Sequence, residues 1–139
     1  MTSIKHINSF EYYEALNNSV DLSHLDIELT ERCNNNCVHC YINQSQDYEV
    51  INKSELRTTF VKQILQQATD LGCLTVRFTG GEPLLREDFQ ELYLFARHLG
   101  LRVILFTNGT LIDERLCKQF RKIPPGKPIS ITVYGMHAQ

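Results

Sequence analysis

The sequence predicts an α/β fold with parallel strands, arranged as part of a (β/α) TIM-like barrel. Short strand-like runs alternate with helix-length segments in the order βαβαβαβ. Helical crossovers of this length join parallel strands through right-handed connections. Apolar and polar residues also alternate along three of the four strand segments, which indicates a curved sheet with helices outside and a polar lumen.

Apart from residues 31–53, which separate the first strand from the first helix, the expected elements follow one another closely. The expected strands are 25–30, 74–79, 102–107 and 128–134, and the expected helices are 54–71, 88–99 and 113–121. The predicted helix-terminal residues are Ser54 with Glu55 in its first turn, Asp88 with Glu91 as a capping box, Asp113, and the terminating Gly72 and Gly100.

The alternation assigns a face to each strand residue. The apolar positions expected to face the helices are Leu25, Ile27, Leu29, Leu74, Val76, Phe78, Ile129, Ile131 and Val133. The opposite face includes Glu28 and Arg77, for which a buried ion pair in the lumen competes with contact to a substrate. Ile104 and Phe106 leave the phase of the third strand ambiguous.

The chain of 139 residues is enough for one compact core. Residues 1–23 are expected to form an N-terminal preface and residues 24–139 the N-terminal portion of an incomplete barrel. Four strands cannot close a barrel, and the last strand would present an open edge, which natural proteins usually cover. We therefore expect the barrel to be truncated after the fourth strand and the chain to be a piece of a longer protein.

Composition narrows the functional class. A net charge of −2 gives no strong field for nucleic acid or an anionic membrane, so neither is expected as a partner. No apolar run approaches the roughly 18 residues of a membrane span, and the first ten residues lack the apolar segment of a signal peptide. These features predict a cytoplasmic protein.

Three of the five cysteines, Cys33, Cys37 and Cys40, lie within eight residues after the first strand. An odd count with a cluster argues against a secreted disulfide framework and for a metal or redox site. A structural zinc ion binds four protein ligands, and a cubane iron–sulfur cluster binds one ligand per iron. Three thiolates would therefore leave one coordination position open on either centre. Cys73 and Cys117, beside apolar segments, are expected to be buried small residues without a role.

Two other interpretations of the cluster remain. A non-catalytic module would bind zinc, with His39 or a distant residue as the fourth ligand, or an iron–sulfur centre that serves structure or electron transfer. A dithiol redox protein would use Cys37 and Cys40, whose spacing is that of a thioredoxin-type pair. The dithiol interpretation requires a helix N-terminus at the first thiol and leaves Cys33 unexplained.

The unusual motifs all follow strands. In parallel α/β folds, ligands bind beyond the carboxyl ends of the strands. The cysteine loop follows the first strand, Gly80-Gly81-Glu82-Pro83 the second, Asn108-Gly109 the third, and Thr132 to Gly135 close the fourth. We expect these four segments to converge on one rim.

With these motifs, the chain over about residues 25–135 resembles the radical S-adenosylmethionine (radical SAM) enzyme superfamily. The resemblance rests on the Cys-x3-Cys-x2-Cys spacing, the Gly-Gly-Glu-Pro at the next strand end, and Thr107-Asn108-Gly109. It implies a [4Fe–4S] cluster on Cys33, Cys37 and Cys40, and S-adenosylmethionine (SAM) at the open iron. It implies reductive cleavage of SAM to a 5′-deoxyadenosyl radical that abstracts hydrogen from a substrate.

The resemblance also implies partners and further binding residues. An electron donor of the flavodoxin or ferredoxin type is expected. The chain is also generally similar to members of the superfamily that modify peptides or proteins and carry a cysteine-rich C-terminal extension. Gly80 and Gly81 would let the backbone approach the SAM amino group, and Pro83 would stiffen the exit from this segment. The remaining expected SAM contacts are Glu82, which would contact the ammonium or orient the loop, Asn108 and Thr132 (Ser130 as second choice) on the ribose, and Tyr41 near the adenine.

Overall fold

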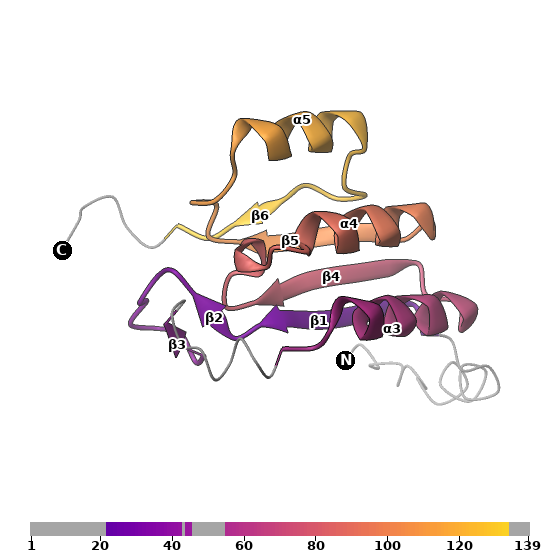
Figure 1. Ribbon diagram of the computed structural model, residues 1–139, viewed down its shortest axis with the longest axis horizontal. Helices are drawn as coiled ribbons and strands as arrows, with labels where there is room; N and C mark the ends of the chain where they lie inside the picture. The colour runs from indigo at the N-terminus through magenta and orange to yellow at the C-terminus, as the bar shows by residue number, and fades with distance from the viewer. Residues whose placement is uncertain (1–21, 43, 46–54, 134–139) are drawn as a thin grey trace, which may run out of the picture.

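The computed structural model describes residues 22–42, 44–45 and 55–133 (Figure 1). Its elements are β1 His24–Thr30, β2 Arg32–Cys33, β3 Gln44–Ser45, α3 Thr58–Asp70, β4 Thr75–Gly80, the 3₁₀ helix η1 Pro83–Leu85, α4 Phe89–His98, β5 Arg102–Thr107, α5 Glu114–Lys122 and β6 Ser130–Ile131. The predicted alternation of strands and helices is confirmed. The predicted boundary between the preface and the barrel stays a prediction, because residues 1–21 lie outside the described part.

The main sheet has the strand order β1-β4-β5-β6, and every neighbouring pair is parallel. This confirms the predicted α/β class with a parallel, partial barrel-like sheet. Figure 1 shows α3 and α4 side by side over one face of the sheet, and the two helices contact each other there. The short β2 and β3 form a separate parallel pair beyond the end of β1. The carboxyl ends of the four parallel strands therefore lie at the same edge of the main sheet, as the helical crossovers predicted.

The core lies between the sheet and its helices. Of the predicted helix-facing residues, Ile27, Leu29, Val76 and Phe78 are buried there, the last two completely, and Leu25 is half-buried against the core. The structure also resolves the phase of the third strand, because Val103 and Leu105 are buried and Phe106 lies on the other face. The helices contribute Val61, Leu65, Ala68, Phe89, Leu92, Tyr93, Ala96 and Phe120 to this core.

Three predicted core positions are wrong. Leu74 lies just before β4 and is exposed, and Ile131 and Val133 at the sheet edge are exposed as well. The observed β6 covers only residues 130–131 instead of the predicted 128–134, of which residue 134 lies outside the described part. Alternation alone cannot distinguish an edge strand from a central one, because both present the same pattern.

The polar face of the sheet carries a different ion pair from the predicted one. Arg77 pairs with Asp26, its register neighbour on β1, and its guanidinium carbon lies 5.0 Å from the centre of the Phe106 ring. Burial by itself raises the pKa of Asp26, but the hydrogen bonds from Arg77 and His24 lower it below the ordinary value. The predicted Glu28–Arg77 pair is wrong, because the register places Glu28 two residues beyond Asp26, opposite Thr79.

Local signals at the helix ends were partly correct. Gly72 and Gly100 follow α3 and α4 with φ of 88° and 84°, as expected for left-handed termini. The Asp113 carboxylate accepts a hydrogen bond from the Leu116 N–H at 2.7 Å, which confirms the predicted cap of α5. No helix in the described part of the chain is both long and apolar enough to cross a membrane.

Of the other two predicted caps, the one before α3 is wrong, and Asp88 is the N-cap residue of α4 but lacks the expected capping hydrogen bond. The helix α3 begins only at Thr58, after Arg57, and Glu55 lies before it instead of in its first turn. Ser54 lies outside the described residues. Asp88 does precede α4, but its side chain makes no capping hydrogen bond and binds Arg86 and Thr58 instead. A stronger partner, a buried guanidinium, takes the carboxylate away from the helix end.

Candidate functional site

The cysteine loop begins at β2, which contains Cys33 and pairs with β3. The segment after β4 contacts this strand directly. The Gly81 N–H donates to the Thr30 carbonyl at 2.7 Å, and the Glu82 N–H donates to the Arg32 carbonyl at 2.8 Å. These two bonds place the Gly-Gly-Glu-Pro segment against the first turn of the cysteine loop, so two of the predicted motifs meet.

The two glycines are needed for this contact. A Cβ added at Gly80 would lie 2.2 Å from the Thr30 carbonyl oxygen, and one added at Gly81 would lie 2.2 Å from the Arg32 carbonyl oxygen. The sequence suggested that glycine here allows close approach to a ligand. The structure shows that protein backbone already occupies the side of these residues where a side chain would lie, so any ligand would have to approach from elsewhere.

Glu82 is completely buried and fully engaged. One carboxylate oxygen accepts from the Leu84 N–H at 3.0 Å and from the Thr107 hydroxyl at 2.8 Å, and the other accepts from the Asn108 N–H at 2.7 Å. Of the two predicted roles, the structure supports orientation of the loop. A buried carboxylate with three donors joins the end of β5 to the turn after β4.

The buried Pro83 begins the 3₁₀ helix η1, which Glu82 caps. The proline ring suits this first position because its missing N–H would have no partner there. The predicted stiff exit from the glycine segment is therefore present as one short helical turn.

Asn108 also faces the cysteine loop. Its side-chain nitrogen donates to the Asn34 side-chain oxygen at 2.8 Å and lies 3.9 Å from the Cys33 sulfur. Thr132 follows the neighbouring strand, and its N–H donates to the Thr107 carbonyl at 3.2 Å, while its side chain is exposed. The structure thus brings Asn108 and Thr132 to the same rim as Cys33, and their contact with a ribose stays a prediction.

Tyr41 lies at the far end of the cysteine loop with 81% of its surface exposed. Its hydroxyl donates to a Glu28 carboxylate oxygen at 2.6 Å, which ties the loop to the polar face of β1. This hydrogen bond, together with partial burial, raises the pKa of the Tyr41 hydroxyl. The exposed ring is free of core packing, so the predicted contact with an adenine remains open to it.

The three cysteines are free thiols of intermediate exposure. Among the described residues, no three His, Cys, Asp or Glu side chains converge on a point that one metal ion could occupy. Soft thiolates suit both zinc and iron–sulfur clusters, and three of them leave one position open on either.

The dithiol interpretation lacks its helix. Residues 37–40 form a turn closed by the Cys40 N–H and the Cys37 carbonyl at 3.0 Å, and the described stretch 22–42 contains no helix. A thioredoxin-type pair depends on a helix N-terminus that lowers the pKa of the first thiol. Cys73 is buried as predicted, and its sulfur donates to the Thr75 carbonyl, whereas Cys117 is exposed, so that prediction is wrong.

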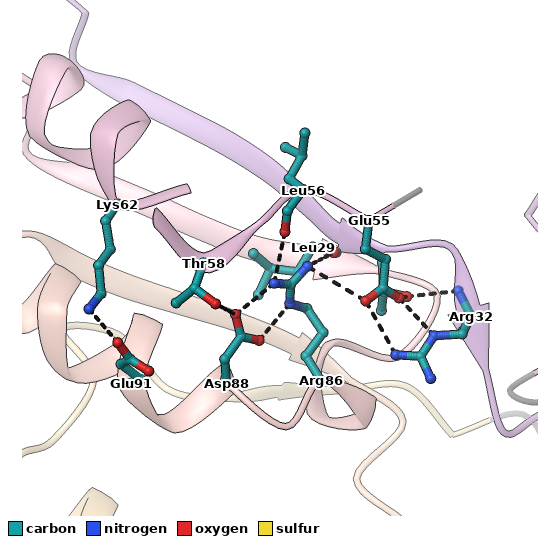
Figure 2. Close-up of polar contacts among 10 residues, drawn as sticks. Leu29, Arg32, Glu55, Leu56, Thr58, Lys62, Arg86, Asp88 and Glu91 are labelled. Atoms are coloured by element: carbon teal, nitrogen blue, oxygen red, sulfur yellow. Dashed lines mark hydrogen bonds and ion pairs between the residues drawn. The ribbon is translucent and has the colours of Figure 1, made fainter. Parts of the chain in front are cut away.

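A buried charge network behind the loop was not predicted (Figure 2). At its centre, the Arg86 guanidinium binds both carboxylate oxygens of Asp88 at 2.7 and 2.8 Å, with 5% of its side chain exposed. It also donates to the Leu29 and Leu56 carbonyls, each at 3.0 Å, and lies 3.7 Å from a Glu55 oxygen. One guanidinium thus joins the end of β1 to the segment that leads into α3.

Glu55 extends this network to the cysteine strand. It accepts two hydrogen bonds from Arg32, at 2.7 and 3.3 Å, and a third from the Thr30 hydroxyl. Arg32 immediately precedes Cys33. The network therefore gives the start of the cysteine loop a second attachment in addition to the glycine segment. Apart from Arg86 and Asp88, which are two residues apart, the charges of the network lie 23 to 31 residues apart in the sequence, and no local pattern connects them.

Asp88 gives this network a pH dependence. Burial raises the pKa of Asp88, but hydrogen bonds from Arg86 and Thr58 outweigh it and hold the pKa below 3.8. We expect Asp88→Asn to lower the free energy of unfolding by about 2 kcal/mol at pH 7. Because a depressed pKa stabilises the fold only while the carboxylate is ionised, this difference should shrink as the pH falls below 3.8.

Urea unfolding of both proteins between pH 7 and pH 3 measures this difference. Comparing the two proteins at each pH cancels the titration of the other carboxylates. A difference that stays constant over the whole range would show that the Asp88 charge does not contribute.

Comparison with known proteins identifies a family in which both of these motifs are expected. Residues 27–137 match the family described as the Radical SAM superfamily. Fe-coproporphyrin III synthase of Methanosarcina barkeri is 41% identical over 95 residues, which cover 68% of this chain and 23% of that protein. PqqA peptide cyclase of Gluconobacter oxydans is 44% identical over 88 residues, 63% of this chain and 24% of that protein. The chain spans about a quarter of the length of these relatives.

Solved structures agree on the fold. SuiB of Streptococcus suis matches with a TM-score of 0.62 and 25% identity, over 84% of this chain and 26% of that one. BtrN in complex with AdoMet and 2-DOIA matches with a TM-score of 0.61 and 20% identity, over 74% of this chain and 42% of that one. With the family match covering most of its length, this chain belongs to the radical SAM superfamily.

Proposed function

We propose that this chain binds a [4Fe–4S] cluster through Cys33, Cys37 and Cys40 and binds SAM beside it, as the N-terminal part of a radical SAM enzyme. When bound, the cluster supplies one electron that cleaves a carbon–sulfur bond of SAM, giving methionine and a 5′-deoxyadenosyl radical that takes a hydrogen atom from the substrate. The chain's own residues position, orient and shield these groups.

The observation that carries this proposal is the joint between the two motifs. Two backbone hydrogen bonds and two close glycine approaches place the Gly-Gly-Glu-Pro segment against Thr30, at the end of β1, and against Arg32, which precedes Cys33 in β2. A cluster held by the cysteines and a SAM held by the glycine segment would therefore be neighbours. This rigid joint favours the enzyme over a module that binds a metal only for structure, which has no need of the second motif.

The remaining residues have defined tasks in this proposal. Backbone groups of Gly80, Gly81 and Pro83 would hold the SAM amino group, while the buried Glu82 keeps their loop in position. Asn108 and Thr132 would lie near the ribose, with Ser130 as the second choice. Tyr41, held by Glu28, would lie along the adenine.

The partners follow from this chemistry. We infer a one-electron donor of the flavodoxin or ferredoxin type. Two substrate classes come from the names of the relatives: a peptide, as in PqqA peptide cyclase and in SuiB bound to precursor peptide SuiA, and a tetrapyrrole, as in Fe-coproporphyrin III synthase. We favour a peptide or protein, in agreement with the sequence prediction. The cytoplasmic location also stays a prediction.

Anaerobic iron–sulfur reconstitution of the full-length protein tests the proposal. We expect about four irons and four sulfides per cysteine triad, a broad charge-transfer absorbance, and release of 5′-deoxyadenosine and methionine when SAM and a reductant are added. Cys37→Ala should abolish the absorbance and the products, because it removes a ligand. Cys117→Ala is the matched control, since this exposed thiol lies outside the cysteine loop.

Two results would contradict the proposal. One zinc per chain without acid-labile sulfide would identify a structural metal module. A metal-free protein with a reversible Cys37–Cys40 disulfide, unaffected by loss of Cys33, would identify a dithiol redox protein.

A further inference from the structure

The Asn108 side chain does more than face the open rim. It reaches back to a residue 75 positions earlier, where its nitrogen lies 3.9 Å from the Cys33 sulfur, within reach of an N–H···S hydrogen bond. The same nitrogen donates to the Asn34 side chain at 2.8 Å. Both hydrogens of the amide group are therefore directed into the cysteine loop, one to oxygen and one to sulfur.

A closed ring of hydrogen bonds fixes this orientation. The Asn34 amide nitrogen donates to the Thr110 hydroxyl at 2.8 Å, and that hydroxyl lies 2.6 Å from the Asn108 side-chain oxygen. Because the hydroxyl accepts from Asn34, its own hydrogen is left to donate to Asn108. The Thr110 N–H donates to the same oxygen at 3.0 Å. A flipped Asn108 amide would place its hydrogens against these donors, so the nitrogen must face Cys33.

A second donor acts on the same sulfur. The Asn35 N–H lies 3.4 Å from the Cys33 sulfur and donates to it. Donor groups beside a cluster thiolate stabilise negative charge. Reduction of a cluster adds negative charge, and hydrogen bonds to its sulfur ligands are among the factors that set its potential. Donors at Cys33 should therefore stabilise the reduced form more than the oxidised form.

We propose that Asn108 is a positioning residue that hydrogen-bonds the Cys33 thiolate and raises the reduction potential of the cluster, in addition to any contact with SAM. The inference rests on the proposed function, because it requires a cluster on Cys33. It assigns to Asn34 and Thr110 the task of holding the Asn108 amide. The loop after β5 would then interact more strongly with the reduced cluster than with the oxidised one, which a role in ribose binding alone would not require.

The test is a redox titration of the reconstituted full-length protein, followed by electron paramagnetic resonance in the absence of SAM. Asn108→Ala removes the donor, and we expect a more negative midpoint potential, equivalent to about a threefold change in the ratio of oxidised to reduced cluster at a fixed potential, a fraction of what a charge-assisted hydrogen bond supplies. Asn108→Asp keeps the acceptor for Thr110 but places a carboxylate beside the sulfur, so its shift should be larger in the same direction.

Asn35→Ala is the matched control. It changes an exposed side chain in the same loop and keeps the backbone N–H that binds Cys33, so the potential should not move. Since SAM is absent, a residue that acts only on the ribose would also leave the potential unchanged. Should both Asn108 variants fail to hold a cluster, Thr110→Val serves instead, because it removes the hydroxyl that fixes the amide and should give a smaller negative shift.

The possible results distinguish failure of this inference from failure of the proposed function. A wild-type cluster with unchanged potentials in the Asn108 variants, or in Thr110→Val when it has to replace them, overturns this inference and leaves the proposed function intact. A wild-type protein that assembles no cluster removes the proposed function and this inference with it.

Discussion

Replacing Gly81 by alanine is expected to abolish SAM binding and to destabilise the fold by about 3 kcal/mol, as overpacking of a closed contact does. The new Cβ would lie 2.2 Å from the Arg32 carbonyl oxygen and 2.8 Å from that of Glu31, both backbone atoms that cannot rotate away. The segment after β4 would have to separate from β2. Its two hydrogen bonds to the Thr30 and Arg32 carbonyls would then break.

The same separation would disturb the candidate site. Glu82 follows Gly81 and accepts hydrogen bonds from three donors on two segments, so a shift of the turn pulls on the end of β5. Isothermal titration with SAM after cluster reconstitution measures the loss of binding, and urea unfolding measures the loss of stability. Iron content distinguishes loss of the cluster from loss of SAM alone.

Gly100→Ala provides the matched control. Its Cβ would meet nothing within 4 Å, so only the left-handed backbone at φ 84° opposes the change. The expected cost is about 1 kcal/mol without loss of SAM binding. If Gly81→Ala behaved like Gly100→Ala and kept wild-type affinity for SAM, the joint between the two motifs would not be what positions the ligand.

This contrast shows which features the sequence could reveal. Strands, helices and their order come from periodicity within one segment, and the termini Gly72, Gly100 and Asp113 come from signals within a few residues. The convergence of the motifs could be predicted as well, because parallel strands bring their carboxyl ends to one edge. The sequence did not reveal why Gly80 and Gly81 are needed, since the residues on which they pack, Thr30 and Arg32, lie about 50 positions earlier and carry no local mark.

The errors at charged residues have one physical cause. A side chain takes the strongest partner in space, and the sequence shows only neighbours along the chain. Asp88 has a capping-box pattern yet binds Arg86, and Glu55 looks like a first-turn residue yet binds Arg32. Asp26 displaced Glu28 as the partner of Arg77 because pairing register, unlike alternation, depends on the neighbouring strand. Buried charges are therefore the part of this region that the sequence predicts least well, and also the part whose loss we expect to destabilise it most.

Arg86→Leu is the second change with a large expected effect, a loss of about 4 kcal/mol in the free energy of unfolding. Leucine fills part of the volume but leaves the Asp88 carboxylate buried with only the Thr58 hydroxyl from this network. The Leu29 and Leu56 carbonyls lose their donor, and Glu55 loses one of its two cations. Removing one partner from a buried ionic network costs far more than the net contribution of the network, because the uncompensated charges remain buried.

The neighbouring pair in Figure 2 supplies the control. Lys62 and Glu91 also join α3 to α4 by an ion pair, but 59% of the Glu91 side chain is exposed. Lys62→Ala should therefore cost no more than about 1 kcal/mol. Comparing both variants by urea unfolding measures how much more a buried guanidinium with several partners contributes to stability than one ion pair with an exposed partner.

Arg86→Leu should also weaken retention of the cluster during gel filtration, whereas Lys62→Ala should not. The reason is that Arg86, Glu55 and Arg32 form a chain of contacts that ends one residue before Cys33. Arg86→Lys, which keeps the charge but cannot bind both Asp88 oxygens and two carbonyls together, should fall between wild type and Arg86→Leu. Equal stability of Arg86→Leu and Lys62→Ala would mean that the cysteine strand is held by the glycine segment alone.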